Sequence, residues 1–208
     1  MSGLDAALPG LFDVLATRIR GTKLRTIGFT STVFGEGAST VALGTCLSLA
    51  SLERTPVLLV DANWLHPSLT HDAGATVRPG LTDVLQGHAA LDEVLVPTSR
   101  PRLVFMPAGD LSGERPELDA LASLLDEALA RFGTIVVDLP PALAREPVVL
   151  PWAMSLQQLF IVVRSGVTPL ALIRQVVEEV GVTRPQVVLN RMPERTPEWA
   201  SARRLAAT

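Results

Sequence analysis

The sequence predicts an α/β fold with a doubly wound, mainly parallel sheet, and two observations lead to this prediction. First, the apolar segments are short continuous runs rich in branched side chains, which is typical of strands buried on both faces. Second, helical patterns lie between these runs, as strand–helix alternation requires. The chain has 208 residues, a length that fits one domain.

The expected strands, in chain order, are residues 26–30, 56–60, 102–106, 134–137, 159–163 and 186–189. The expected helices between them are residues 39–52, 116–131 and 169–180. In the second helix, four leucines fall on one face and the acidic residues lie elsewhere; the leucines are Leu118, Leu121, Leu125 and Leu129. An amphipathic helix is expected over residues 8–20, before the first strand, and a short helix over residues 198–207.

Composition excludes several classes of protein. Apolar residues make up 48% of the chain and the mean hydropathy is +0.34, but no run reaches the roughly 18 to 20 apolar residues of a membrane span. No cationic segment precedes an apolar one at the N-terminus, so we expect a cytoplasmic protein. The net charge of −3 argues against nucleic acid as a partner, and one cysteine excludes an internal disulfide framework.

The loop after the first expected strand reads Ser31-Thr-Val-Phe-Gly-Glu-Gly-Ala-Ser-Thr40 and leads into a helix. Such a loop predicts an anion site, because backbone N–H groups point outward and the helix dipole favours negative charge. Two positions depart from the phosphate-loop pattern G-x-x-x-x-G-K-[ST], since Thr32 replaces the first glycine and Ala38 replaces the lysine. The loop alone therefore leaves a second interpretation open, a tight chain reversal that serves only close packing.

Polar side chains end three further expected strands. Asp61 follows the second strand, Asp138 follows a later one, and Asn190 and Arg191 end the last. In a doubly wound sheet, ligands bind at the carboxyl ends of the strands, so these groups lie on the same rim as the loop. One strand-end aspartate is commonly a turn or helix cap, but three such ends beside a glycine-rich loop predict a ligand site.

The order of these motifs resembles the deviant-Walker P-loop ATPases, the group of MinD, ParA and Mrp. Within that group it is similar to the cytoplasmic kinase domain of bacterial tyrosine kinases of polysaccharide export. The resemblance runs from Arg25 to Arg191 and includes Asp61-Ala-Asn63-Trp-Leu-His-Pro67, Pro79-Gly-Leu-Thr-Asp-Val-Leu85 and Met106-Pro-Ala-Gly109. It implies a single MinD-like (SIMIBI) P-loop domain over residues 25–191, preceded by a helix and lead-in over 1–24 and followed by a tail over 192–208.

The resemblance also implies a site for ATP or ADP with Mg²⁺. Asp61 would act on the phosphoryl acceptor and Asp138 would support the metal, which makes these two the catalytic candidates. The metal would be held by Ser39, Asp61 and Asp138. The nucleotide would be held by Gly35, Glu36, Gly37, Ala38, Ser39, Thr40, Asn190 and Arg191. Relatives commonly self-associate, so a homodimer or a higher oligomer is expected.

Several features of these kinases are missing. Ala38 stands where the lysine belongs, and the pattern Asp-x-Asp-x-Arg reads Asp61-Ala-Asn63-Trp-Leu65. The Glu-x-x-Arg-x-x-Arg element that packs neighbouring kinase subunits is not visible around Arg18 and Arg20, and the chain contains no tyrosine at all. Loss of a comparable preorganised donor costs roughly 100- to 1,000-fold in rate.

Another cation could replace the missing lysine. Lys23, the only lysine, is separated from the loop by a strand of roughly 20 Å, so the candidates are Arg145 and Arg164 on the expected rim. Ala38 is either a natural loss or an engineered change. The further losses at Asn63 and Leu65 favour a natural one.

The favoured hypothesis is a degenerate P-loop protein that binds nucleotide weakly or not at all. It would act as a regulator or scaffold with a membrane component of polysaccharide export or of the envelope, and would reach the membrane through that partner. The alternative is an active Mg-ATPase or kinase with a lysine-to-alanine change at Ala38. A Rossmann-type dinucleotide enzyme is a third hypothesis. The third glycine and the ribose-binding acid of the dinucleotide-binding motif are missing, which argues against it.

Five other side chains were considered as functional candidates. His66, His71 and His88 lack the spacing of metal ligands and are interpreted as surface or turn residues. Cys46 is expected in the core. Trp64 is either a core residue or an exposed anchor for a partner, and the core is favoured.

Overall fold

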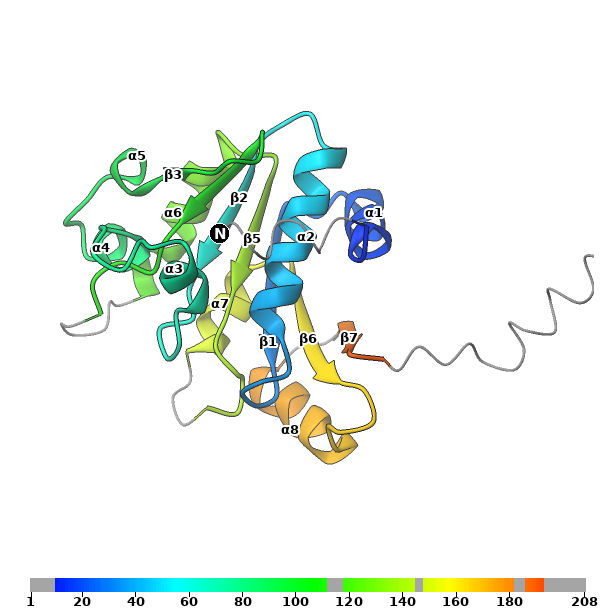
Figure 1. The fold of residues 1–208 in the computed structure, drawn as a ribbon. Helices are drawn as coiled ribbons and strands as arrows, with labels where there is room; N and C mark the ends of the chain where they lie inside the picture. The colour runs from blue at the N-terminus through cyan, green and yellow to red at the C-terminus, as the bar shows by residue number, and fades with distance from the viewer. Residues whose placement is uncertain (1–9, 112–117, 145–147, 182–185, 193–208) are drawn as a thin grey trace, which may run out of the picture.

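The computed structural model describes residues 10–111, 118–144, 148–181 and 186–192. In this part of the chain, seven strands form one sheet in the order β3-β4-β2-β5-β1-β6-β7 (Figure 1). Neighbouring strands are parallel except for the pair β3 and β4. The strands are β1 (Thr26–Ser31), β2 (Val57–Asp61), β3 (Val96–Pro97), β4 (Leu103–Met106), β5 (Thr134–Asp138), β6 (Gln158–Arg164) and β7 (Gln186–Asn190).

Helices cover both faces of the sheet. One layer contains α1 (Asp13–Thr22), α2 (Ala38–Leu52) and α3 (Ser68–Asp72). The other contains α4 (Leu81–Leu85), α5 (Leu91–Val94), the 3-10 helix η1 (Leu118–Ala120), α6 (Leu121–Leu129), α7 (Val149–Ser155) and α8 (Leu170–Val180). None of the described helices is long and apolar enough to cross a membrane.

Each central strand sends side chains into both layers. Val57 and Leu59 of β2 pack beneath α2, whereas Leu58 and Val60 pack on the opposite face. Because both faces are buried, these strands have no polar alternation, which explains the continuous apolar runs and the high hydropathy. The predicted doubly wound, mainly parallel sheet is confirmed.

Helix α2 is enclosed between the sheet and α1. Every residue from Val41 to Ala50 is buried, and α1 packs on the outer side of α2. Gly44 permits this approach, since a Cβ at that position would lie 2.2 Å from a ring carbon of Phe12. Burial on all sides explains why residues 37–52 carry no charge.

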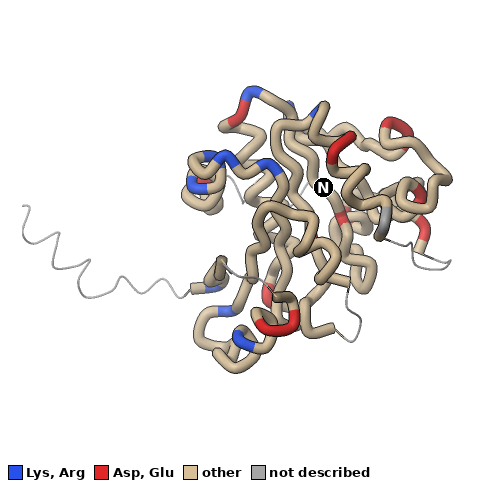
Figure 2. Tube along the Cα trace, turned by 180° about the vertical axis from the view of Figure 1, so that it is seen from behind, with Lys and Arg blue, Asp and Glu red and all other residues tan. Residues whose placement is uncertain are grey.

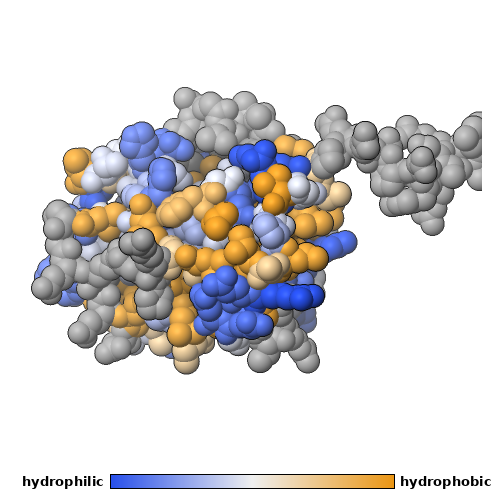
Figure 3. Space-filling model, turned by 90° about the horizontal axis from the view of Figure 1, so that it is seen from below, coloured by the Kyte–Doolittle hydropathy of each residue, from blue (hydrophilic) through white to orange (hydrophobic). Residues whose placement is uncertain are grey.

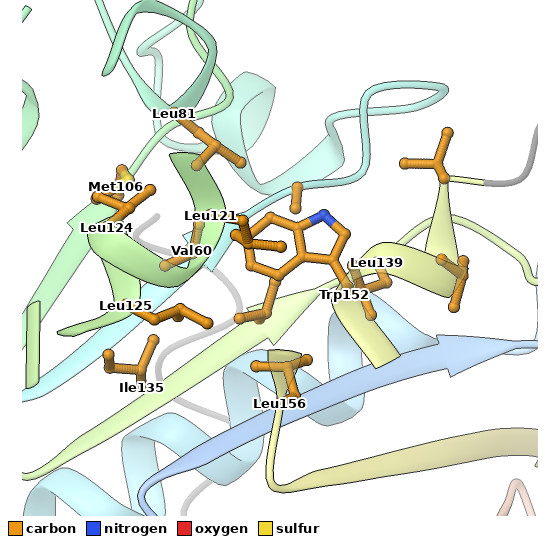
Figure 4. Close-up of a cluster of buried hydrophobic side chains, with 14 of the residues drawn as sticks. Val60, Leu81, Met106, Leu121, Leu124, Leu125, Ile135, Leu139, Trp152 and Leu156 are labelled. Carbon is orange, nitrogen blue, oxygen red and sulfur yellow. The ribbon is translucent and has the colours of Figure 1, made fainter. Parts of the chain in front are cut away.

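The opposite layer packs around Trp152 of α7. Its indole lies among Leu121 and Leu125 of α6 and Leu139 after β5 (Figure 4). The side chain is 1% exposed, and its Nε1 has no hydrogen-bond partner among the described residues. This cluster joins α6 and α7 to the strand end that carries Asp138, and so supports one side of the rim.

The six expected strands and the three expected internal helices are confirmed, with shifts of a few residues at their ends. The first helix begins at Asp13 rather than at residue 8, although residues 8 and 9 lie outside the described part. The expected helix 198–207 and residues 116–117 also lie outside it. The sequence did not predict five short elements, which are β3, α3, α4, α5 and α7. The first four have two to five residues each, too few to show a periodicity, and α7 contains a proline.

Candidate functional site

The loop between β1 and α2 presents a series of unused backbone N–H groups. Gly35 and Gly37 have φ angles of 83° and 95°, a left-handed conformation that favours glycine. A Cβ on Gly37 would also lie 2.4 Å from Nδ2 of Asn190. Within the described chain, no protein acceptor takes a hydrogen bond from the N–H groups of Gly35 through Thr40. The loop and the N-terminus of α2 therefore supply the donors and the field of an anion site.

Glu36 holds this loop in shape from within. Its carboxylate is 3% exposed, and Oε2 accepts hydrogen bonds from the backbone N and the hydroxyl of Thr32, at 2.7 and 2.8 Å, and from the N of Val33, at 3.1 Å. Its Oε1 accepts a hydrogen bond from the hydroxyl of Thr168, which precedes α8. The side chain is thus engaged with protein donors, and what Glu36 offers to a ligand is its backbone N–H.

A solvent-open hollow of about 580 Å³ lies in front of the loop, and we call it the loop hollow. It is lined by Ser31, Phe34, Gly35, Gly37, Ala38, Ser39, Thr40, Asn63, His66, Ser68, Leu139 and Pro141.

Ala38 is the first residue of α2 and brings no charge to the hollow. Neither lysine nor arginine is among the described lining residues. Lys23 caps the far end of α1, before β1 begins, and the basic residues of that region lie away from the loop (Figures 1 and 2). Arg164 ends β6 on the rim but is exposed and does not line the hollow, while Arg145 lies outside the described residues.

Asp61 ends β2 and is fully buried, with its oxygens occupied by protein donors. Oδ2 accepts hydrogen bonds from the N and the hydroxyl of Thr70, both at 2.8 Å, and Oδ1 accepts one from the N of Asn63 at 3.1 Å. Burial raises the pKa of Asp61, and these hydrogen bonds and the charge of His66 partly offset the rise. In this conformation Asp61 anchors the turn that follows β2 and the start of α3.

Asp138 ends β5 directly beside Asp61, since the two residues are paired in the parallel register of β2 and β5. It is 0% exposed, and among the described residues neither of its oxygens has a hydrogen-bond partner of ordinary geometry. Burial raises the pKa of Asp138 well above its usual range, and the charge of Asp61 raises it further. The nearby hydroxyl of Ser39 lowers it in part.

This unpartnered carboxylate gives a test of whether the residues fit Mg²⁺. Burying a charged group without partners is costly, so such groups generally pair with a cation or lose their charge. Asp138 and the Ser39 hydroxyl supply hard oxygen ligands of the kind Mg²⁺ takes, with Asp61 adjacent. The donor set therefore fits the metal, which would neutralise the two carboxylates and the charge of a bound phosphate.

Asn190 and Arg191 end β7, and the structure brings Asn190 to the loop. Its Nδ2 donates a 2.8 Å hydrogen bond to the backbone oxygen of Glu36, and its Oδ1 accepts one from the N of Arg191. Arg191 is exposed, with a positive φ of 53°. Asn190 thus braces the loop between β1 and α2 from a distant strand, and its expected contact with adenine stays a prediction.

The structure adds residues to the hollow that the motifs did not single out. Ser31, Phe34 and Ser68 line it, and so do Asn63 and His66, which the sequence presented only as a lost carboxylate and a turn histidine. His66 is exposed in a turn, as expected, but it also lines the hollow in front of the loop. Cys46 and Trp64 are buried, so both core predictions are confirmed. No cluster of three metal-ligating side chains occurs among the described residues.

Exposed apolar side chains lie in the loop and beside Thr168, which bonds to the loop through Glu36, and we call them the apolar rim. Val33 and Phe34 of the loop are 43% and 57% exposed, and Val167 and Leu170 before α8 are 60% and 72% exposed. Figure 3, which views the molecule from this side, shows an apolar band across the face. Exposed apolar groups that gather around a polar site are typical of surfaces that meet another molecule.

No protein-family model matches the chain. In sequence it is 32% identical over 163 residues to the succinoglycan biosynthesis transport protein ExoP of Rhizobium meliloti, covering 75% of this chain and 20% of that protein. It is also 32% identical to the tyrosine-protein kinase CpsD of Streptococcus agalactiae, covering 62% of this chain and 59% of the kinase. The chain thus spans between a fifth and three fifths of the length of these relatives.

Among solved structures, the chain is similar to the kinase domain of VpsO, with a TM-score of 0.74 and 26% identity over 88% of this chain and 97% of that domain. The chain therefore resembles bacterial tyrosine kinases of polysaccharide biosynthesis in sequence and their kinase domains in fold. A ParA family ATPase from Chlorobium tepidum has the same fold, with a TM-score of 0.66 at 22% identity, covering 83% of this chain and 76% of that one. The predicted resemblance is therefore confirmed, while the role of each site residue in this P-loop domain stays a prediction.

Proposed function

We propose that this chain is a degenerate P-loop domain that binds Mg-nucleotide weakly and acts as a regulator or scaffold in polysaccharide biosynthesis or export. One observation carries the proposal. The loop, its braces and the Asp138 carboxylate are intact, but Ala38 leaves the described lining of the loop hollow without lysine or arginine. Phosphoryl transfer depends on neutralising charge on the phosphoryl oxygens. A site without this cation can therefore still bind nucleotide while transferring no phosphoryl group.

The absence of tyrosine supports a role other than autophosphorylation. A chain without tyrosine has no phenol hydroxyl to accept a phosphoryl group from itself or from a second copy. None of these 208 residues could therefore serve as a tyrosine acceptor. The second carboxylate and the arginine of the Asp-x-Asp-x-Arg pattern are also replaced, by Asn63 and Leu65.

The partner we propose is a membrane component of a polysaccharide-export or envelope complex, which would bring a cytoplasmic domain to the membrane. Two observations support a protein partner. ExoP, a matched relative, is described as a succinoglycan biosynthesis transport protein. The apolar rim of Val33, Phe34, Val167 and Leu170 offers exposed surface beside the site, which suits a partner or a second copy of this chain.

The test is a calorimetric titration of Mg-ATP and Mg-ADP into this protein and into its Ala38→Lys variant. We expect weak binding by the natural sequence and tighter binding by the variant, because a compact cation is restored at the N-terminus of α2. ATP hydrolysis, measured as the release of phosphate, should be negligible for the natural sequence. Hydrolysis by the natural sequence at ordinary ATPase rates would overturn the proposal.

The second candidate is an active Mg-ATPase or kinase in which Ala38 alone disables the site. The intact bracing of the loop by Glu36 and Asn190 favours it, since one substitution would leave the remaining parts in place. It predicts that Ala38→Lys restores turnover as well as binding. If the variant binds Mg-ATP tightly but still does not hydrolyse it, the degenerate-domain proposal stands and this alternative fails.

A further inference from the structure

His66 occupies the turn between β2 and α3, where it faces the phosphate-loop side of the molecule. Its backbone N donates hydrogen bonds to the backbone oxygen of Asn63 at 3.0 Å and to Oδ1 of Asn63 at 3.2 Å. The turn is therefore fixed at its base, while the side chain of His66 is exposed and lines the loop hollow. Within the described lining, His66 is the one side chain that can carry a positive charge.

The groups around the hollow carry an excess of negative charge, which a cation would offset. Two buried carboxylates, Asp61 and Asp138, lie beneath it on adjacent strand ends. A bound di- or triphosphate would add more negative charge, and Ala38 supplies nothing to offset it. Backbone N–H groups and Mg²⁺ offset part of this charge, but a side-chain cation at the mouth strengthens anion binding further through a charge-assisted hydrogen bond.

We propose that the protonated imidazole of His66 contacts the phosphate oxygens of a ligand in the loop hollow and makes its affinity depend on pH. This inference rests on the proposed function, because it names a contact within the same site. It places the replacement cation on the turn after β2, rather than on Arg145 or Arg164. An imidazole ordinarily changes charge near pH 6.5, so binding would tighten on mild acidification.

The charged groups around His66 are acidic. Asp61 at the end of β2 interacts with it electrostatically, and Asp138 is paired with Asp61 on β5. Asp72 of α3 lines an adjoining hollow that shares Ser39, Thr40 and Ser68 with this one. Helix α2 contributes hydroxyls but no charge to this side. These groups attract a cation toward the mouth of the hollow, and no described basic residue of the lining competes with His66 for the phosphate.

The experiment measures the affinity of the whole chain for Mg-ADP and for Mg-pyrophosphate by calorimetry, near pH 6 and near pH 8. The natural protein is compared with His66→Gln, His66→Arg and the control His71→Gln, whose target is an exposed histidine of α3 outside the hollow. We expect the natural protein and the control to bind about tenfold more tightly near pH 6 than His66→Gln does. The His66→Arg variant should bind tightly at both pH values, because its guanidinium stays charged.

Protonation of the ligand affects the affinity of every variant equally. A difference in pH dependence between variants therefore reports the protonation of His66. If His66→Gln keeps the same affinity and the same pH dependence as the natural protein, the role of His66 is refuted while weak nucleotide binding stands. If no variant, including Ala38→Lys, binds either ligand at either pH, both the inference and the nucleotide-binding part of the proposed function fail. Thermal unfolding of each variant shows whether it is folded, and His66 is exposed enough to be replaced without loss of the fold.

Discussion

Replacing Asp138 by asparagine should stabilise the protein in the absence of Mg²⁺. Asp138 is fully buried, its two oxygens lack partners among the described residues, and Asp61 lies beside it in register. Asparagine has nearly the same shape but carries no charge, so the substitution removes both the desolvation of a carboxylate and its repulsion by Asp61. Strongly perturbed carboxylates cluster at functional sites, and the proposed ligand of this one is Mg²⁺.

The expected gain follows from the environment of the two oxygens. Leaving a buried polar group unsatisfied costs about 1–3 kcal/mol, and more if the group is charged. Asparagine is also unsatisfied there but neutral, so we expect Asp138→Asn to raise the unfolding free energy by about 1–2 kcal/mol at neutral pH. For a chain of this size each kcal/mol shifts Tm by about 2–4 °C, which gives a rise of a few degrees.

The gain should depend on pH in one direction. Folding raises the pKa of Asp138, so the folded state binds this proton more tightly than the unfolded state. The unfolding free energy of the natural protein therefore falls as the pH rises from about 4, the pKa of an unperturbed aspartate, through the raised folded-state pKa. The advantage of Asp138→Asn should be largest at neutral pH and should shrink toward pH 4.

The assay is thermal and urea unfolding between about pH 4 and pH 8, with Asp126→Asn, an exposed change on α6, as the matched control. The control should shift stability little at any pH. A variant that is less stable than the natural protein at neutral pH, or equally stabilised at every pH, would refute the reasoning. With millimolar Mg²⁺ and ADP, the natural protein should gain stability and Asp138→Asn should gain much less, because it lacks a metal ligand.

Two further predictions concern the loop. Glu36→Ala should lower the unfolding free energy by about 2–4 kcal/mol in urea unfolding, because the buried donors of Thr32 and Val33 lose their acceptor. Glu36→Gln retains one acceptor oxygen and should lose about half as much, and equal losses would contradict this account. Gly37→Ala should cost about 1–2 kcal/mol from its positive φ alone and should weaken Mg-ADP binding, since the new Cβ displaces Asn190. Tight binding by this variant would show that the Asn190 brace is dispensable.

Much of the fold could be predicted from local pattern. Continuous apolar runs predicted six strands, β1, β2, β4, β5, β6 and β7. Apolar residues at helical spacing predicted α2, α6 and α8. The short elements could not be predicted, since α4 and α5 occupy four or five residues each and are held by contacts with β4 and α6. Their positions depend on packing rather than on their own periodicity.

The candidate site shows the same division. Motif order placed the loop, Asp61, Asp138 and Asn190 on one rim, because the carboxyl ends of parallel strands share an edge. Local sequence could not reveal that Asn190 reaches back across the sheet to the backbone of Glu36, 154 residues away. Such a contact depends on which strands are neighbours, and strand order is not encoded in any one segment.

The sequence by itself determined the fold class, the missing lysine at Ala38 and the absence of tyrosine, because each is a property of local pattern or of composition. Only the tertiary structure decided which polar groups are satisfied. It shows Asp61 engaged by Thr70, Asp138 buried without a partner and His66 at the mouth of the hollow. The physical reason is that burial and hydrogen bonding depend on residues distant in the chain, whereas strand and helix patterns depend on neighbours in sequence.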